Sequence, residues 1–200
     1  MKYLQSCLMI LFATLSACKM NKVYEIKNDK GVVMHRITVL GDTSNGKNGL
    51  YESFDEQGRP IEAAEYHDGK LQGTRKLYEN GAIYSIETRN ADLFEGKYQA
   101  FHKNGQVSVE GIYVNNVMSG EWVSYYPSGA IKDKVIMKDN AENGPFTEYY
   151  ENGKIKAQGN FLDGPDEEGE LLMYDSTGSL EKKMDCKKGI CKTLWKKDSL

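Results

Sequence analysis

The chain lacks an excess of charge of either sign. Its 26 Lys and Arg residues stand against 29 Asp and Glu residues, which gives a formal net charge of −3 over 200 residues. This balance excludes a strongly basic protein built to bind nucleic acid. Proline is scarce, with 4 residues, while apolar residues make up 40% and charged residues 28% of the chain. This composition is typical of a globular protein and excludes both a fully disordered chain and a multi-span membrane protein.

The sequence also has little that could carry catalysis. Its three histidines, His35, His67 and His102, contain no i, i+4 pair, and no HExxH motif is present. The G-x-S-x-G motif of serine hydrolases and the GxxxxGK[ST] phosphate loop do not occur. The acidic run at 166–168 lacks the D-x-D-x-D-G pattern of a calcium loop, so we interpret it as a solvated loop. We therefore expect no catalytic residues, no metal site and no cofactor.

The amino terminus has the pattern of an export signal. Residues 1–18 read MKYLQSCLMILFATLSAC, in which a basic Lys2 precedes an apolar run and a final Leu-Ser-Ala-Cys box. The run is much shorter than the roughly 20 residues that a membrane-spanning helix needs. This segment resembles the bacterial lipoprotein signal, which implies removal of 1–17 and acylation of Cys18. An ordinary secretory signal and an uncleaved anchor are the alternatives.

The same resemblance implies a location in the cell envelope. Acyl chains on Cys18, including a palmitate-type chain, would hold the protein firmly, since each buried methylene contributes about 0.8 kcal/mol. Residues 18–22 would form a short lipid-anchored tether. Lys19 follows the cysteine, as in lipoproteins that Gram-negative cells pass on to the outer membrane.

Glycine is abundant, with 20 residues, and it recurs at a fixed spacing. Two glycine series advance in steps of 23 to 25 residues, and the second follows the first by eight or nine residues. Two series that stay in phase over five steps indicate about six copies of one unit. The members are Gly49, Gly73, Gly96, Gly120, Gly144 and Gly169 in the first series, and Gly58, Gly81, Gly105, Gly129, Gly153 and Gly178 in the second.

Each unit has the pattern of a β-hairpin. Aromatic residues come first, then a two-residue turn signal, then an alternating apolar run. The dipeptides Asn80-Gly81, Asn104-Gly105 and Asn152-Gly153 favour a type I′ turn, which needs positive φ at both central positions. The period of two along the runs favours strands over helices.

Pairing the strands outward from these turns predicts one aromatic sheet face. Phe146 falls opposite Gly159 and Tyr98 falls opposite Gly111, an arrangement in which a ring covers bare backbone. The same pairing places Trp122 opposite Val135, Tyr150 opposite Ile155 and Glu148 opposite Ala157. Either the sheet exposes this face as an interaction surface, or it twists enough to bury the stripe itself. The candidate binding residues on it are Tyr98, Trp122, Tyr126, Phe146 and Tyr150.

The repeat resembles the MORN repeat, in the looser variant common in bacterial proteins, with a G-x-aromatic-x-x-Tyr-x-x-x-Gly-x-Ile skeleton. The likeness covers about six units over residues 49–195. It implies an all-β fold, an elongated antiparallel sheet of repeated β-hairpins. We expect 23–48 to form a degenerate leading hairpin and 196–200 to form a tail.

Two cysteines lie near the end of the repeat region. With Lys188-Gly189 as a turn, Cys186 faces Cys191 across a hairpin. An exported protein meets oxidising conditions, which favour a disulfide between them. Two free thiols are the alternative.

These patterns predict a non-catalytic cell-envelope lipoprotein whose repeat sheet acts as an interaction scaffold for a protein or a glycan. An antitoxin or immunity-type protein that neutralises a partner toxin is the alternative, since many bacterial proteins that resemble this repeat carry an antitoxin label. An enzyme acting on cell wall or lipid would need a convergent polar pocket, for which the sequence gives no sign.

Overall fold

The computed structural model describes residues 21–198, and all of its regular structure is β. No helix in this part of the chain is long and apolar enough to span a membrane. The strands are β1 (Lys22–Lys27), β2 (Val33–Val39), β3 (Gly49–Phe54), β4 (Pro60–His67), β5 (Lys70–Glu79), β6 (Ala82–Asn90), β7 (Leu93–Phe101), β8 (Val107–Val114), β9 (Val117–Tyr125), β10 (Ile131–Lys138), β11 (Ala141–Tyr149), β12 (Ile155–Phe161), β13 (Gly169–Tyr174), β14 (Leu180–Lys187) and β15 (Ile190–Lys196).

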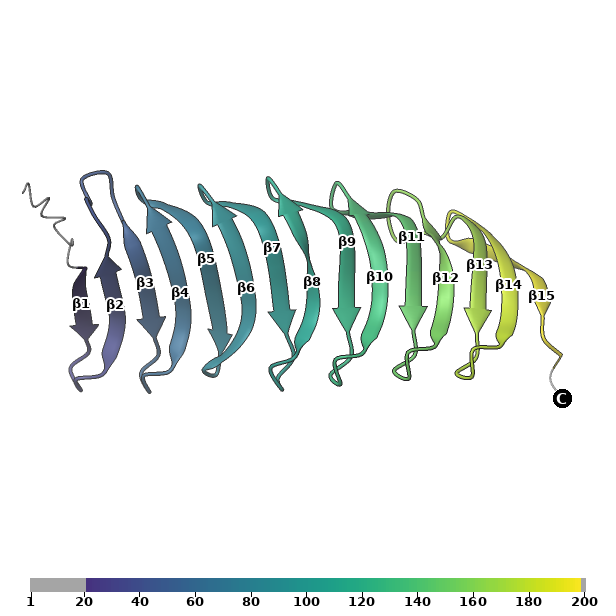
Figure 1. Cartoon of the computed structure of the whole chain (residues 1–200), viewed down its shortest axis with the longest axis horizontal. Coiled ribbons are helices and arrows are strands. Elements are labelled where there is room, and N and C mark those ends of the chain that lie inside the picture. The colour runs from purple at the N-terminus through teal and green to yellow at the C-terminus, as the bar shows by residue number, and fades with distance from the viewer. Residues whose placement is uncertain (1–20, 199–200) are drawn as a thin grey trace, which may run out of the picture.

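The fifteen strands form one open antiparallel sheet in which spatial order equals chain order. Each strand pairs with the strands before and after it in the sequence, so the hairpins stack side by side along one long axis (Figure 1). The prediction of an all-β, elongated sheet of repeated hairpins is confirmed. The sheet leaves β1 and β15 as its two free edges.

The hairpin register agrees with the pairing predicted through the middle of the repeats. Phe146 pairs with Gly159, Tyr98 with Gly111, and Trp122 with Val135. The ring that lies closest over Gly111 comes from the next strand, since a Cβ at this glycine would collide with the indole of Trp122. Bare backbone on β8 therefore makes room for the largest side chain of the sheet.

The predicted turn type is wrong at two of the three Asn-Gly sites. Asn80 has a φ of 52° beside Gly81 at 83°, as a type I′ turn requires. At Asn152-Gly153 only the glycine has positive φ, and the Asn152 side chain accepts a hydrogen bond from the Lys154 amide at 3.0 Å. Asn104 and Gly105 behave in the same way.

The extra turn residues shift the pairing next to the turn. In the fifth repeat the backbone closes between Tyr150 and Lys154, and Tyr149, in place of Tyr150, pairs with Ile155. A bulge in β12 absorbs the difference, so the predicted pairs return from Glu148 onward.

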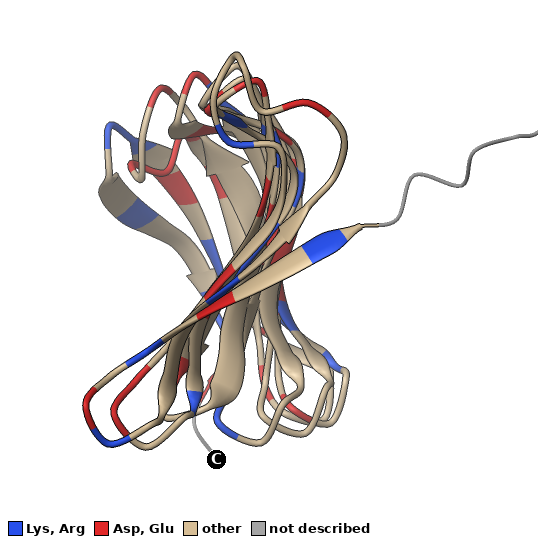
Figure 2. Cartoon of the chain, turned by 90° about the vertical axis from the view of Figure 1, so that its left-hand side faces the viewer, with Lys and Arg blue, Asp and Glu red and all other residues tan. Residues whose placement is uncertain are grey.

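Almost all burial is confined to one face, which we call the inner face. Every buried residue among 21–198 lies on it by strand parity and register: Gly49, Ala64, Ser85, Glu87, Gly111, Trp122, Met137, Phe146, Ala157, Leu171, Met184 and Cys186. Seen end-on, the sheet is twisted and curved rather than flat (Figure 2). This shape lets side chains of neighbouring strands cover one another without a second layer.

Candidate binding face

The middle of the inner face is an aromatic cluster. The ring of Trp122 lies 5.8 Å from that of Tyr98 and 5.2 Å from that of Tyr113, the latter at a near-perpendicular angle. Phe94 extends the cluster, with its ring centroid 4.7 Å from that of Tyr113. Trp122 is 5% exposed, so its neighbours already cover most of its surface. Burial also raises the pKa of the Tyr98 and Tyr113 hydroxyls.

The carboxyl-terminal part of the inner face is an apolar core. Phe146 is buried and stacks on Phe161 with ring centroids 4.2 Å apart. Ala157, Leu171 and Met184 complete this cluster with Cys186. Of the two alternatives for the aromatic stripe, the packed core is the one that describes Trp122 and Phe146.

Tyr126 and Tyr150 lie at hairpin ends, outside the packed centre. Each tyrosine hydroxyl donates a hydrogen bond to a backbone carbonyl one repeat further on, from Tyr126 to Tyr149 and from Tyr150 to Tyr174, both at 2.8 Å. His102 makes the corresponding contact with the Tyr125 carbonyl at 2.9 Å. These side chains tie consecutive hairpins together.

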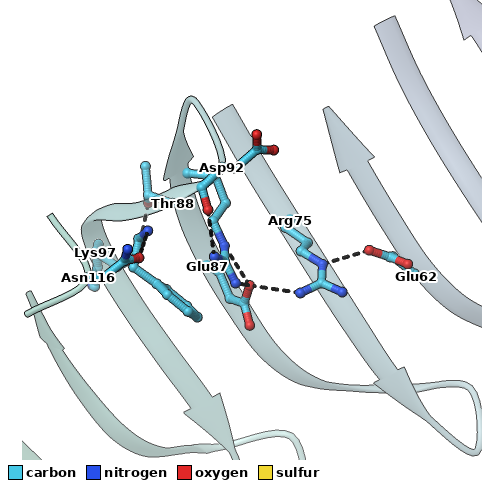
Figure 3. A network of polar contacts seen from close by, with 9 residues as sticks. Glu62, Arg75, Glu87, Thr88, Asp92, Lys97 and Asn116 are labelled. Carbon is cyan, nitrogen blue, oxygen red and sulfur yellow. Dashed lines mark hydrogen bonds and ion pairs between the residues drawn. The ribbon is translucent and has the colours of Figure 1, made fainter. Parts of the chain in front are cut away.

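A charged cluster interrupts the inner face between β4 and β6. Arg75 binds the carboxylate of Glu62 at 2.6 Å and lies 3.4 Å from that of Glu87 (Figure 3). Arg89 binds the same Glu87 oxygen at 2.7 Å. Burial alone would lower the pKa of Arg75, but its hydrogen bond to Glu62 and the charges of both carboxylates outweigh burial and raise it.

Arg89 connects the charged cluster to the aromatic cluster. Its guanidinium carbon lies 3.3 Å from the centroid of the Phe94 ring, a close cation–π contact. It also donates a hydrogen bond to the Asp92 carbonyl at 3.2 Å. Along the inner face, from β4 toward β14, the charged cluster is therefore followed directly by the aromatic cluster and then by the apolar core.

The amino-terminal end of the inner face is hollow. A cavity of about 420 Å³, open to solvent, lies over β1 to β4, and we call it the N-terminal pocket. The rings of Tyr51 and Tyr66 meet edge-on in it with centroids 5.1 Å apart. Burial raises the pKa of Tyr66, and the charge of Glu62 adds to the rise.

Lys47 reaches over the pocket from the loop between β2 and β3. Its Nζ lies 4.9 Å from the ring centroid of Tyr51 and 4.6 Å from that of Tyr66. Within the described part of the chain, no carboxylate lies within ion-pairing distance of this ammonium. The arrangement offers a positive charge, two aromatic rings and an open volume at one place.

Sequence reasoning missed both this pocket and the charged cluster. Tyr51 lies two residues after the first repeat glycine, so strand parity could have placed it on the inner face. Lys47 lies in a loop outside the repeat, where period and parity give no position. Arg75 and Glu87 belong to the copy around Asn80-Gly81, which is one residue shorter than the others.

The cysteine predictions fall in two regions. Cys186 and Cys191 pair in register and are joined by a disulfide across β14 and β15. Cys18, the predicted lipidation site, lies outside the described residues. Among residues 21–198, no group of three or more His, Cys, Asp or Glu side chains is placed to hold a metal ion.

Comparison with known proteins adds a family. A family model with the description "Uncharacterised protein" matches residues 17–181, which is most of the chain. No curated protein matches the sequence.

Proposed function

The chain belongs to the family of this model, and we propose that it is a non-catalytic lipoprotein of the cell envelope whose sheet is a scaffold that binds a protein or a glycan. The observation that supports binding is the N-terminal pocket. Trp122 and Phe146, further along the same face, are covered by their neighbours, whereas Tyr51 and Tyr66 line an open cavity. Partners bind where ring surface is accessible.

Exposed apolar side chains border the pocket. On β1, Tyr24 and Ile26 share the inner-face parity that Ile37 and Tyr51 continue. Ile26 is 53% exposed and contributes to the pocket wall. A bound partner would cover these side chains, which gives binding a hydrophobic contribution of roughly 25 cal/mol per Å² removed from water.

The lipid anchor would place this pocket close to a membrane. Four peptide steps separate Cys18 from Lys22, the first residue of β1. An extended chain of that length spans at most about 14 Å. Acylation of Cys18 would therefore hold the pocket end of the sheet beside the bilayer.

Partner capture from envelope extracts tests the binding proposal. We expect the wild-type chain to enrich a partner. The Tyr66→Ala variant should enrich the same partner about tenfold less, since one ring of the pocket is removed. Tyr84→Ala is the matched control, because Tyr84 is an exposed tyrosine outside the N-terminal pocket. Equal capture by all three proteins, each shown to melt normally, would contradict the proposal.

Membrane fractionation tests the lipoprotein part. Cys18→Ala should leave an unprocessed precursor or move the protein to the soluble fraction, because the acceptor of the acyl chains is missing. Cys7→Ala is the control, since that cysteine lies inside the segment predicted to be removed. Normal processing and unchanged membrane retention of Cys18→Ala would overturn it.

A further inference from the structure

We infer that the N-terminal pocket binds an acidic sugar, with the carboxylate of the sugar on Lys47 and its ring against Tyr51 and Tyr66. This inference rests on the proposed function in its glycan form and names the chemistry of the ligand. It depends on three features of the pocket, which are its charge, its aromatic rings and its size.

The charge of the pocket favours an anion. Glu62, at the pocket wall, is neutralised by Arg75 at 2.6 Å, and Glu52 lies 3.8 Å from Arg36. Lys47 has no carboxylate partner in the described part of the chain and is held by ring contacts alone. An incoming carboxylate would therefore meet one unneutralised positive charge, and the resulting charge-assisted hydrogen bond is stronger than a neutral one.

The two tyrosine rings favour a sugar over a simple anion. The rings of Tyr51 and Tyr66 both line the cavity and stand at 67° to each other, so the cavity wall offers aromatic surface in two orientations. The C–H face of a pyranose packs on an aromatic face in the way that an aliphatic side chain does. His35 and Ser53 pair across β2 and β3 at the pocket wall, where they can bond to sugar hydroxyls.

The size of the cavity fits a short glycan segment. Its volume of about 420 Å³ lies at the lower end of the range of roughly 300–1,000 Å³ that small-molecule sites occupy. Because the cavity is open to solvent, a longer glycan could continue past the bound residue. Neutral sugars would use the rings but leave Lys47 unpaired.

Titration calorimetry on the full chain tests this inference with two probes. The first is a disaccharide that contains one uronic acid, and the second is the methyl ester of the same disaccharide. We expect wild-type protein to bind the acid about tenfold more tightly than the ester, in line with one charge-assisted hydrogen bond. In Lys47→Gln the preference should disappear while the affinity for the ester stays the same.

Two controls separate charge at the pocket from general effects. Lys132→Gln removes an exposed lysine of β10 that has no ion-pair partner in the described part of the chain, and this variant should keep the tenfold preference. Inorganic phosphate at equal ionic strength should compete weakly, because it offers charge and no ring. Competition by phosphate at the affinity of the acidic disaccharide would show a general anion site and overturn the inference.

The remaining outcomes distinguish the inference from the function that it rests on. Equal affinity for acid and ester overturns the acidic-sugar inference and leaves a glycan scaffold standing. No binding of either disaccharide, together with Tyr66-dependent capture of a protein, also overturns it and leaves a protein scaffold. Capture that does not depend on Tyr66 overturns the proposed function itself.

Discussion

Two buried positions on the same sheet face show that buried places on that face can hold side chains of very different chemistry. Glu87 on β6 and Trp122 on β9 are each 5% exposed, and both lie on the central row of the inner face. Trp122 is covered by aromatic rings, while Glu87 is held by Arg75 and Arg89. Backbone register therefore fixes which positions are buried, and neighbouring side chains decide which chemistry is tolerated there.

The two kinds of burial differ in energetic consequence. An aromatic cluster gains from removing ring surface from water, so each member contributes directly to stability. A buried ion pair gains Coulomb energy but loses the hydration of both ions, and the net contribution is small as long as the pair is intact. The comparison predicts that the charged cluster can be replaced as a unit, whereas the aromatic cluster cannot lose its central ring.

The largest effect is expected for Trp122→Ala. Removing a buried indole should lower the free energy of unfolding by about 4 kcal/mol, because the lost burial adds to a cavity in the centre of the face. Denaturant unfolding measures this loss. Trp195→Ala is the matched control: Trp195 is 45% exposed on the edge strand β15, and its removal should cost less than about 1 kcal/mol. Equal losses for the two variants would refute a packed centre.

Breaking the charged cluster should cost nearly as much. Glu87→Gln leaves Arg75 and Arg89 without their shared carboxylate in a buried site, and the expected loss is about 3 kcal/mol. Replacing the whole cluster, with Glu62 changed to Gln, Arg75 to Met, Glu87 to Leu and Arg89 to Met, should leave the stability within about 1 kcal/mol of wild type. A quadruple variant that is less stable than Glu87→Gln would show that the ion pairs stabilise the fold by more than the desolvation of the ions destabilises it.

A smaller effect is expected for Gly111→Ala. The added methyl would collide with the Trp122 ring, which must move against Tyr98 and Tyr113. We expect a loss of about 2 kcal/mol in the free energy of unfolding. Combining it with Trp122→Phe should recover part of the loss, since the smaller ring leaves space. Full additivity of the two changes would contradict direct contact between the glycine and the indole.

The smallest effect concerns pH at the outer face. Glu110 accepts a hydrogen bond from the Tyr125 hydroxyl at 2.7 Å, and this contact raises the pKa of Tyr125 to about 12. This hydrogen bond stabilises the fold at pH values below the ordinary tyrosine pKa near 10. The stabilisation is lost as the pH rises through the raised pKa of about 12. An ultraviolet titration of tyrosinate should lose its latest-titrating group in Tyr125→Phe. Tyr149→Phe is the comparison variant, and a late step that persists in Tyr125→Phe would refute the assignment.

The opposite sign holds for the carboxylate of this contact. The hydrogen bond from Lys97, followed by that from Tyr125, lowers the pKa of Glu110 below its usual value of 4.5. The ionised Glu110 carboxylate therefore stabilises the fold at pH values above its usual pKa, and this stabilisation is lost as the pH falls through the lowered pKa. Stability measured between pH 3 and 5 should therefore fall less steeply in Glu110→Gln than in wild type.

Much of the fold could be predicted from the sequence because the same hairpin pattern occurs in about six copies of the repeat. The glycine period and the alternating apolar runs predicted hairpins, and the pairing of Phe146 with Gly159 is observed. The turn type failed because Asn152 can satisfy the turn in two ways. A type I′ turn and a longer turn closed by the asparagine side chain both suit Asn-Gly, and the dipeptide alone does not choose between them.

The candidate site was harder to predict for a physical reason. Strand parity assigns Trp122 to one face of the sheet. How much of its side chain is exposed depends on which rings the twist of the sheet brings against it, and strand pairing alone does not determine those contacts. Lys47 contacts two tyrosines that follow it by 4 and 19 residues, from a loop that the repeat does not describe. The parts of a repeat protein outside the repeats give the fewest sequence signals, and β1, β2 and the Lys47 loop, which complete the pocket beside the first repeat, are such parts.

The most direct test of the account uses the two tryptophans of the chain. Oxidative labelling followed by mass spectrometry measures how fast solvent-borne radicals reach each indole in the folded protein. A packed inner face predicts that Trp195 is modified several-fold faster than Trp122, and that the difference disappears on unfolding. Equal rates in the folded protein would show that Trp122 is open to solvent, and would contradict both the packed centre and the assignment of binding to the N-terminal pocket.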